Sequence, residues 1–256
     1  MKKILLGSAA LLALFAVAPA GAADMAAAPA YKAPPPPLFT WTGIYFGVHA
    51  GGGWGTKHWY NASPFAPVGL DVGFHHVRGG FGGGQIGANY QVGPWVLGVE
   101  AQGAWASMTG DNQNLVFNLG GATIINNSKI DSLGVVAGRV GYAFDRLMPY
   151  VIGGGAWVHD KFTTTTQVNS TAFASGSETR SGWMAGVGVE YAFWNNLSLK
   201  LEYNYMDFGR HRNGLTDCPV NCAGLGFAQE IVQQLNTVKI GLNYRFGGYG
   251  PVYAAY

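Results

Sequence analysis

The amino-acid sequence predicts an all-β fold, namely an eight-stranded antiparallel up-and-down transmembrane β-barrel with long extracellular loops and short periplasmic turns. The first observation is strict alternation in Val238–Phe246, where apolar side chains occupy every second position and polar or cationic side chains the positions between. Successive side chains of a strand point to opposite faces, so this stretch has one apolar and one polar face. The second is that charged residues are only 11% of the chain, against roughly 25% for an average soluble domain. The third is that connections between strand-like stretches are alternately short and long, as in outer-membrane barrels.

Residues 1–23 have the three parts of a secretory signal peptide. Two lysines supply positive charge, the apolar stretch 4–17 follows, and small residues from Ala18 onward form a cleavage zone. We expect cleavage after Ala22 or Ala23. The apolar stretch is short for a spanning helix, which needs about 20 residues. If the mature chain lies in a membrane, it must therefore do so as a closed barrel.

Residues 24–40 are rich in proline and alanine. Proline fixes φ and has no N–H for a sheet, so we expect an extended linker that lies outside the barrel, on its periplasmic side. The barrel is predicted over residues 41–246, and residues 247–256 form a C-terminal tail.

Eight strand-like stretches make up the predicted barrel. In the seventh, for example, Leu197, Leu199 and Leu201 alternate with Lys200 and Glu202. The eight stretches are Trp41–Trp54, Phe81–Val92, Trp95–Trp105, about Ile130–Phe144, Tyr150–Val158, Gly182–Phe193, Leu197–Phe208 and Val238–Phe246.

The connections between these stretches fall into two length classes. The long ones lie near 55–80, 106–129, 159–181 and 209–236, and they are rich in Asn, Thr, Ser and Gly. The short ones lie near 93–94, 145–149 and 194–196. Short turns are periplasmic and long loops extracellular in such barrels, so both termini are expected at the periplasmic end.

Aromatic residues cluster at both ends of the apolar face. Trp95 and Trp105 are ten residues apart on one side of a strand, and so are Trp183 and Phe193, while Phe246 ends the last strand. A strand tilted by about 40° advances about 2.5 Å per residue along the barrel axis, so ten residues cover about 25 Å. That span matches the apolar band between two aromatic girdles, where the rings lie at the lipid–water interfaces.

The opposite face of the strands carries the charges, and it must point into the barrel. These residues are Glu100, Arg139, Glu190, Lys200, Glu202, Lys239 and Arg245. Isolated buried charges are very costly, so the enclosed charges must pair. The interior of an eight-stranded barrel is just wide enough for side chains to fill it. We therefore predict a polar, ion-paired interior with no open channel.

Two cysteines, Cys218 and Cys222, are separated by three residues. An exported chain is in an oxidising compartment, which favours a small disulfide loop. The alternative is a metal site, but His211 is the only further candidate ligand in that segment, and structural zinc sites need four ligands. No metal or other cofactor is predicted.

Six further segments resemble a known family: Trp41-Thr-Gly-Ile-Tyr-Phe-Gly, Gly84-Gln-Ile-Gly-Ala-Asn-Tyr-Gln, Trp95-Val-Leu-Gly-Val-Glu100, Gly138-Arg-Val-Gly-Tyr142, Pro149-Tyr-Val-Ile-Gly-Gly-Gly-Ala156 and the Tyr-Arg-Phe246 ending. Together they resemble the small outer-membrane proteins of alphaproteobacteria, often called outer-membrane immunogenic or porin-family proteins, which are related in shape to the OmpA transmembrane domain. The pattern Lys239-x-Gly241-x-x-Tyr244-x-Phe246 also resembles the signal by which the barrel-assembly machinery recognises its clients. Such chains usually stop at the terminal Phe, whereas residues 247–256 follow here.

The resemblance implies a location in the cell outer membrane, a role in envelope integrity, surface exposure and, in some members, adhesion or immune recognition. It assigns no catalytic residues. The partners we expect are outer-membrane lipids and lipopolysaccharide, the barrel-assembly machinery, and host or surface partners that contact the loops. Nucleic acid is excluded as a partner because no Lys/Arg cluster could follow its phosphates.

Three functions remain open on the sequence: a non-enzymatic surface barrel, a narrow diffusion porin, and a hydrolase with its site at the outer rim. The nearest acid–histidine pairs for a hydrolase are His159-Asp160 and Asp207 with His211, and neither forms a set of nucleophile, base and orienting group. The histidines of the first long loop, His58, His75 and His76, match no tight metal-ligand motif. We therefore predict a non-enzymatic envelope protein. A soluble ligand-binding barrel is an architectural alternative that requires a polar exterior.

Overall fold

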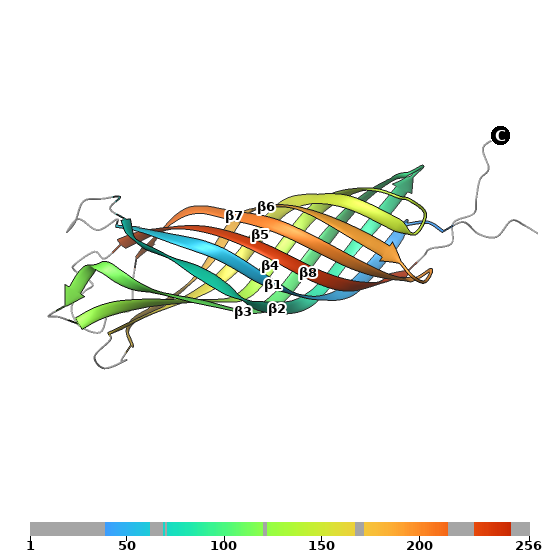
Figure 1. Cartoon of the computed structure of the whole chain (residues 1–256). Helices are drawn as coiled ribbons and strands as arrows, with labels where there is room; N and C mark the ends of the chain where they lie inside the picture. Colours follow the sequence, from blue (N-terminus) through green and yellow to red (C-terminus); the bar gives the residue numbers. More distant parts are fainter. Residues whose placement is uncertain are drawn as a thin grey trace, which may run out of the picture. The chain divides into compact units, whose positions relative to one another are not determined.

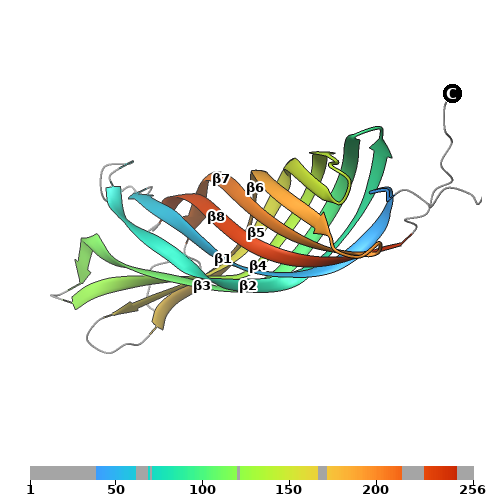
Figure 2. The ribbon, with the colours of Figure 1, turned by 45° about the vertical axis from the view of Figure 1, so that its right-hand side comes forward.

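The computed structural model describes residues 39–61, 69, 71–119, 122–166, 172–214 and 228–246. In these residues each strand pairs antiparallel with its neighbours in sequence, and β1 pairs with β8 to close the barrel (Figure 1 and Figure 2). The predicted fold is confirmed. Within the described residues, no helix is long and apolar enough to cross a membrane. The strands are β1 Gly43–Asn61, β2 Asp71–Val92, β3 Trp95–Leu119, β4 Ala122–Tyr142, β5 Leu147–Thr166, β6 Ala172–Ala192, β7 Leu197–Gly214 and β8 Ala228–Phe246.

Several sequence-based predictions fall on residues outside this description. They are the signal peptide at 1–23, all but the last two residues of the linker at 24–40, the tail at 247–256, and the disulfide between Cys218 and Cys222. All of these stay predictions.

Short turns join the strands at one end of the barrel (Figure 1). Between β2 and β3 the turn is Gly93-Pro94, and Gly93 has a φ of 58°, which glycine adopts without steric cost. In the β4–β5 turn, Asp145 has a φ of 54°, a region in which Asp is more common than most residues. The first turn lies where the sequence predicted it. The second was predicted at 145–149 but lies at 143–146, because β4 ends at Tyr142 and β5 begins at Leu147.

At the other end, the strands continue far past the predicted starts of the long loops. β3 was expected to end at Trp105 but runs to Leu119, and β5 was expected to end at Val158 but runs to Thr166. The prediction of loops at 106–129 and 159–181 was therefore largely wrong, and much of 55–80 and 209–236 is also strand. Asn, Thr and Ser were taken as loop residues, yet strand pairing depends on backbone hydrogen bonds that any non-proline residue provides.

A β-bulge interrupts the pairing of β4 with β5. Ser132 pairs with His159 and Ile130 with Asp160, so β4 has one extra residue, Asp131, between these pairs. As a result, Ile130 and Leu133 are both buried in the interior although they are three residues apart. A bulge adds a residue to one strand and thereby reverses the face on which later residues lie.

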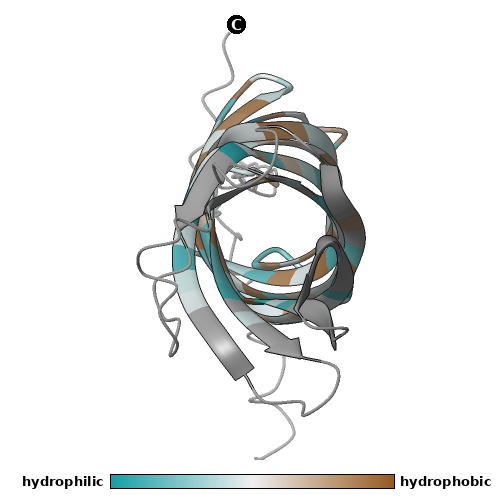
Figure 3. Cartoon of the chain, turned by 90° about the vertical axis from the view of Figure 1, so that its left-hand side faces the viewer, coloured by the Kyte–Doolittle hydropathy of each residue, from teal (hydrophilic) through white to brown (hydrophobic). Residues whose placement is uncertain are grey.

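The two faces of the barrel differ sharply in character. The outward positions carry large apolar side chains such as Val99, Leu199, Val189 and Ile240, which are 64%, 44%, 36% and 52% exposed. Between them, the inward positions are buried. Hydrophobic and hydrophilic residues accordingly alternate along the strands when the barrel is viewed end-on (Figure 3). A soluble barrel would show the reverse arrangement, so the apolar exterior excludes that alternative.

Candidate functional site

The interior of the barrel holds all seven charged residues that the sequence predicted for the lumen. Each faces inward because it occupies an alternate position of its strand, and each is at most 2% exposed. They are Glu100 on β3, Arg139 on β4, Glu190 on β6, Lys200 and Glu202 on β7, and Lys239 and Arg245 on β8. What they do depends on how they pair, because a buried charge without a partner is strongly unfavourable.

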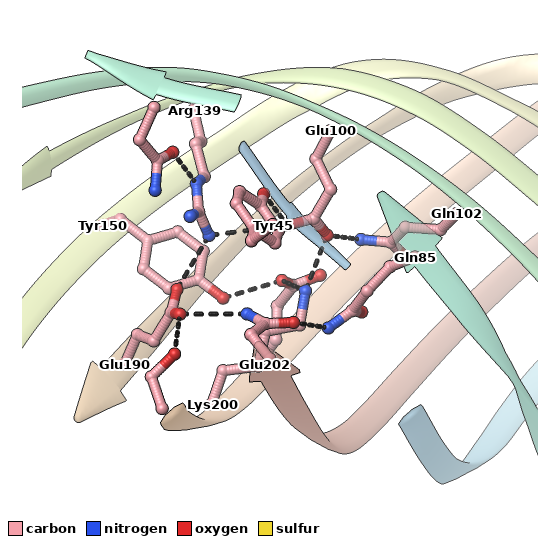
Figure 4. Close-up of polar contacts among 12 residues, drawn as sticks. Tyr45, Gln85, Glu100, Gln102, Arg139, Tyr150, Glu190, Lys200 and Glu202 are labelled. Atoms are coloured by element: carbon pink, nitrogen blue, oxygen red, sulfur yellow. Dashed lines mark hydrogen bonds and ion pairs between the residues drawn. The ribbon is translucent and has the colours of Figure 1, made fainter. Parts of the chain in front are cut away.

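Arg139 links two of the carboxylates (Figure 4). Its Nη1 donates to Glu190 Oε2 at 2.9 Å and lies 3.4 Å from Glu100 Oε2. Its Nε donates to Asn89 Oδ1 at 3.0 Å. One arginine thus joins β2, β3 and β6 across the lumen, which side chains of this length can do only in a narrow barrel.

Two lysines complete the network. Lys200 Nζ donates to Glu100 Oε1 at 2.6 Å and lies 3.4 Å from Glu202 Oε2. Lys239 Nζ lies 2.8 Å from Glu202 Oε1 and also donates to Gln102. Together with the arginine, three cations face three carboxylates. The network is therefore electrically neutral.

Arg245, the seventh charge, makes no ion pair with a carboxylate among the described residues. It lies instead against residues 39–42, which precede β1 and are here called the N-terminal strap. Its Nη1 donates to the carbonyl oxygen of Thr40 at 2.6 Å. Its guanidinium lies over the rings of Trp41 and Phe39, with centroid distances of 4.5 and 5.0 Å. The strap, whose first two residues end the predicted linker, thus packs against the inward face of β8 at the short-turn end.

Two tyrosines that sequence reasoning did not place in the lumen fill the space around Arg139. The guanidinium lies 4.7 Å from the ring centroid of Tyr45 and 5.2 Å from that of Tyr150. Each hydroxyl donates to a carboxylate of the network. Glycine makes room for both rings: a Cβ at Gly87 or Gly188 would lie 2.4 Å from the facing ring. The high glycine content of the chain therefore has a packing role at these positions.

Nearer the long hairpins, the interior is apolar, which corrects the prediction of a polar lumen throughout. The buried side chains here include Phe81, Met108, Leu133, Val135, Met184, Met206, Phe208 and Leu235. Between them and the charged network lies a cavity of about 20 Å³, lined by His49 among others, which is room for about one water molecule. The strand prediction ended before two of these residues, Met108 on β3 and Leu235 on β8.

A second buried charge cluster lies beyond the apolar layer, and sequence reasoning missed it. Lys57 Nζ donates to Asp160 Oδ1 at 2.8 Å, and Arg180 lies 3.8 Å from the other oxygen of that carboxylate. Arg180 also pairs with Glu178 at 3.2 Å and donates to Gln233. The alternation of inward and outward positions continues past the predicted strand ends, and this pattern could have identified these residues.

The His159–Asp160 pair considered for a hydrolase does not form. Asp160 points into the barrel, whereas His159 lies on the outer face with its Nδ1 3.0 Å from Thr179 Oγ1. Asp207 accepts a hydrogen bond from the Gly209 N–H at 2.8 Å, and the side chain of His211 lies outside the description. Within the described residues, no group of three or more His, Cys, Asp or Glu side chains is arranged to hold a metal ion.

The sequence matches a family model described as an outer membrane protein beta-barrel domain over residues 8–246. The chain belongs to this family. The 31 kDa outer-membrane immunogenic protein of Brucella melitensis biotype 1 is 34% identical over 262 residues, which cover 96% of this chain and 100% of that protein. The 22 kDa outer membrane protein of Rhizobium leguminosarum bv. viciae is 30% identical, with coverage of 85% and 83%. The protein is therefore a small β-barrel of the cell outer membrane.

Solved structures of outer-membrane barrels are also similar in fold. The outer membrane protein OprG from Pseudomonas aeruginosa is 15% identical with a TM-score of 0.47, and the likeness covers 80% of this chain and 97% of OprG. The outer membrane protease OmpT from Escherichia coli is 11% identical, also with a TM-score of 0.47, and coverage of 81% and 98%. At these identities the likeness concerns the fold alone.

In this outer-membrane barrel, the apolar outer face meets lipid, and the predicted girdle residues lie on it. Trp95, Trp105, Trp183, Phe193 and Phe246 all point outward and are 39–81% exposed. They pack against further outward aromatics: Trp95 lies 5.3 Å from Tyr142, Trp183 5.6 Å from Tyr205, and Phe246 4.7 Å from Phe46. Outward aromatic rings near both ends of the strands are typical of the two lipid–water interfaces of a membrane.

The residues of the predicted assembly signal all lie on β8. Lys239 and Gly241 face the lumen, whereas Tyr244 and Phe246 face lipid, and Phe246 pairs with Ile44 at the seam with β1. Recognition of this pattern by the assembly machinery stays a prediction.

Proposed function

We propose that this protein is a closed, non-enzymatic component of the outer membrane that supports the envelope and presents its long hairpins at the cell surface. The observation that carries this proposal is the filled interior. A neutral network of six charges occupies the periplasmic part of the lumen, and an apolar layer lies beyond it, followed by the outer charge cluster. Ions would have to displace the network and the apolar layer, and the small cavity between them has room for about one water molecule.

The separation of His159 from Asp160 supports the non-enzymatic part of the proposal. One side chain is on the outer face and the other is sealed in the lumen, so they cannot act together as base and orienting group. The alternative function, a narrow diffusion porin, requires a continuous wet path along the lumen, and the packing described above opposes one.

Conductance of the purified full chain in planar bilayers tests the proposal. We expect no stable single-channel steps under conditions in which a general porin, as positive control, conducts. Liposome swelling with small sugars gives a second measurement, for which we expect a rate equal to that of protein-free liposomes. Stable conductance steps together with solute entry would overturn the proposal in favour of the porin.

The assembly machinery and surface partners belong to the same proposal. The pattern at Lys239, Gly241, Tyr244 and Phe246 supports recognition during assembly, since its aromatic residues lie on the open outer face of the last strand. The far extension of the β3–β4 hairpin to Leu119 and Ala122 supports contact with molecules outside the cell. Deletion of this hairpin's distal part should leave membrane insertion intact while reducing binding to surface partners.

A further inference from the structure

A polar groove crosses the outer face of β3, β4 and β5, outside the barrel. Its volume is about 400 Å³. The side chains that line it include Thr109 and Asp111 from β3, Lys129 from β4, and Lys161 and Thr163 from β5. We call this feature the basic groove, after its two lysines.

The strand register places three cations along one row of the sheet. Arg78 on β2 pairs with Thr109, Thr109 with Lys129, and Lys129 with Lys161. Directly paired residues have their Cβ atoms about 5 Å apart, so the two lysines are immediate neighbours. Like charges in this arrangement destabilise a sheet unless an anion lies between them.

The row lies at the height of lipid head groups. Lys161 is four residues beyond Trp157 on β5, and Thr109 is four residues beyond Trp105 on β3. Both tryptophans face outward at the extracellular end of the apolar band. Four residues of a tilted strand advance about 10 Å, which carries the groove from the edge of the hydrocarbon into the head-group region.

The acids near the groove leave it with surplus positive charge. Lys161 donates to Asp131 at 2.7 Å. Asp111 is the other acid at the groove. Lys129 has no carboxylate within ion-pair distance in the part of the chain that the structure describes, and neither does Arg78. Three cations thus face two acids, and one of the acids is already paired.

We propose that the basic groove binds a phosphate group of an outer-leaflet glycolipid, the phosphorylated disaccharide of lipid A. Lys129 and Lys161 bind the phosphate from two adjacent strands, and the hydroxyls of Thr109 and Thr163 donate further hydrogen bonds. Arg78 reaches the same lipid's head group from the next strand. Charge-assisted hydrogen bonds to phosphate are strong. The bound anion also offsets the repulsion between Lys129 and Lys161, which face each other on adjacent strands. This inference rests on the membrane orientation of the barrel and not on whether the lumen conducts.

Native mass spectrometry of the purified full chain in detergent, titrated with bis-phosphorylated lipid A, tests the inference. Loss of two surface cations in Lys129→Gln/Lys161→Gln should weaken binding roughly 30-fold. Dephosphorylated lipid A should bind wild type and this variant equally. If inorganic phosphate at millimolar concentration displaces the lipid, the groove is a site for free phosphate and the glycolipid assignment is overturned.

Arg210→Gln provides the matched control. Arg210 is an exposed cation on β7, away from the groove, with its guanidinium 5.0 Å from the ring centroid of Tyr60. Its loss should change lipid A binding less than about twofold, whereas Lys129→Gln alone should weaken binding by roughly fivefold. If Arg210→Gln and Lys129→Gln lost the same amount of lipid A binding, the lipid would be attracted by the overall positive charge of the barrel and not by the groove. That result would overturn the inference. Heat-modifiable mobility on gels confirms that each variant is folded, and conductance of wild type tests the proposed function separately.

Discussion

At the scale of single residues, Arg139 is the side chain on which the charged interior most depends. Arg139→Ala leaves the Glu190 and Glu100 carboxylates short of a cation in a site from which water is excluded. Removal of one partner from a buried ion pair costs about 3–5 kcal/mol. We expect the free energy of unfolding in urea, measured with the barrel in micelles, to fall by about that amount.

The double variant Arg139→Met/Glu190→Met separates charge balance from packing. It removes one cation and one anion together, so it should recover much of the stability that Arg139→Ala loses, because apolar replacements of a whole buried pair are often nearly neutral. A double variant less stable than Arg139→Ala would contradict the view that the unpaired charge is what destabilises the single variant.

The direction of each charged residue could be predicted from the period of two, but its partner could not. Glu100 and Lys200 are 100 residues apart in sequence and meet at 2.6 Å because the barrel closes around them. Tyr45 and Tyr150 could not be recognised as part of the site for a similar reason. Their role depends on which glycine faces them across a strand pair, and that is set by register.

At the scale of elements, the N-terminal strap is a contact that no periodic pattern could indicate. Trp41 precedes β1, is 0% exposed, and donates through Nε1 to the Asp145 carbonyl at 3.0 Å and through its backbone N–H to Gln91 Oε1 at 2.7 Å. Trp41→Ala removes this packing, and truncation of a buried tryptophan costs about 3–5 kcal/mol. Urea unfolding should show a loss of that size.

Trp194→Ala is the control for this prediction. Trp194 lies in the β6–β7 turn at the same end of the barrel and is 65% exposed. An exposed substitution of this kind should change the free energy of unfolding by no more than about 0.5 kcal/mol. If Trp41→Ala and Trp194→Ala lowered the free energy of unfolding by the same amount, the strap would not add to the stability of the barrel.

The strands themselves could be located from the sequence only within the apolar band. There, the alternation of apolar and polar residues is enforced by lipid on one side and the lumen on the other. Beyond the band, water lies outside, so outward positions of β3 and β5 are polar and the apolar half of the pattern is lost. The β4 bulge at Asp131 then reverses the inward face between Ile130 and Leu133. Both effects led the sequence prediction to end these strands early.

At the scale of the whole molecule, strand number, order and orientation could all be predicted, because closure of a barrel in lipid allows few alternatives. The layering of the interior could not. It consists of a charged network, an apolar layer and an outer charge cluster along one axis. Which inward residues share a layer depends on the shear of the barrel, and a linear sequence does not reveal the shear.

This layering predicts that the charged network and the apolar layer each block the passage of ions, one after the other along the lumen. Tyr45→Ala/Tyr150→Ala should loosen the charged network, and Leu133→Ala/Met206→Ala should widen the cavity of about 20 Å³ beside the apolar layer. An ion must pass both layers, so neither double variant alone should show stable conductance in planar bilayers, whereas the quadruple variant should. Circular dichroism and heat-modifiable mobility check that each variant is still a barrel. Stable conductance in either double variant would show that the remaining layer does not seal the lumen by itself.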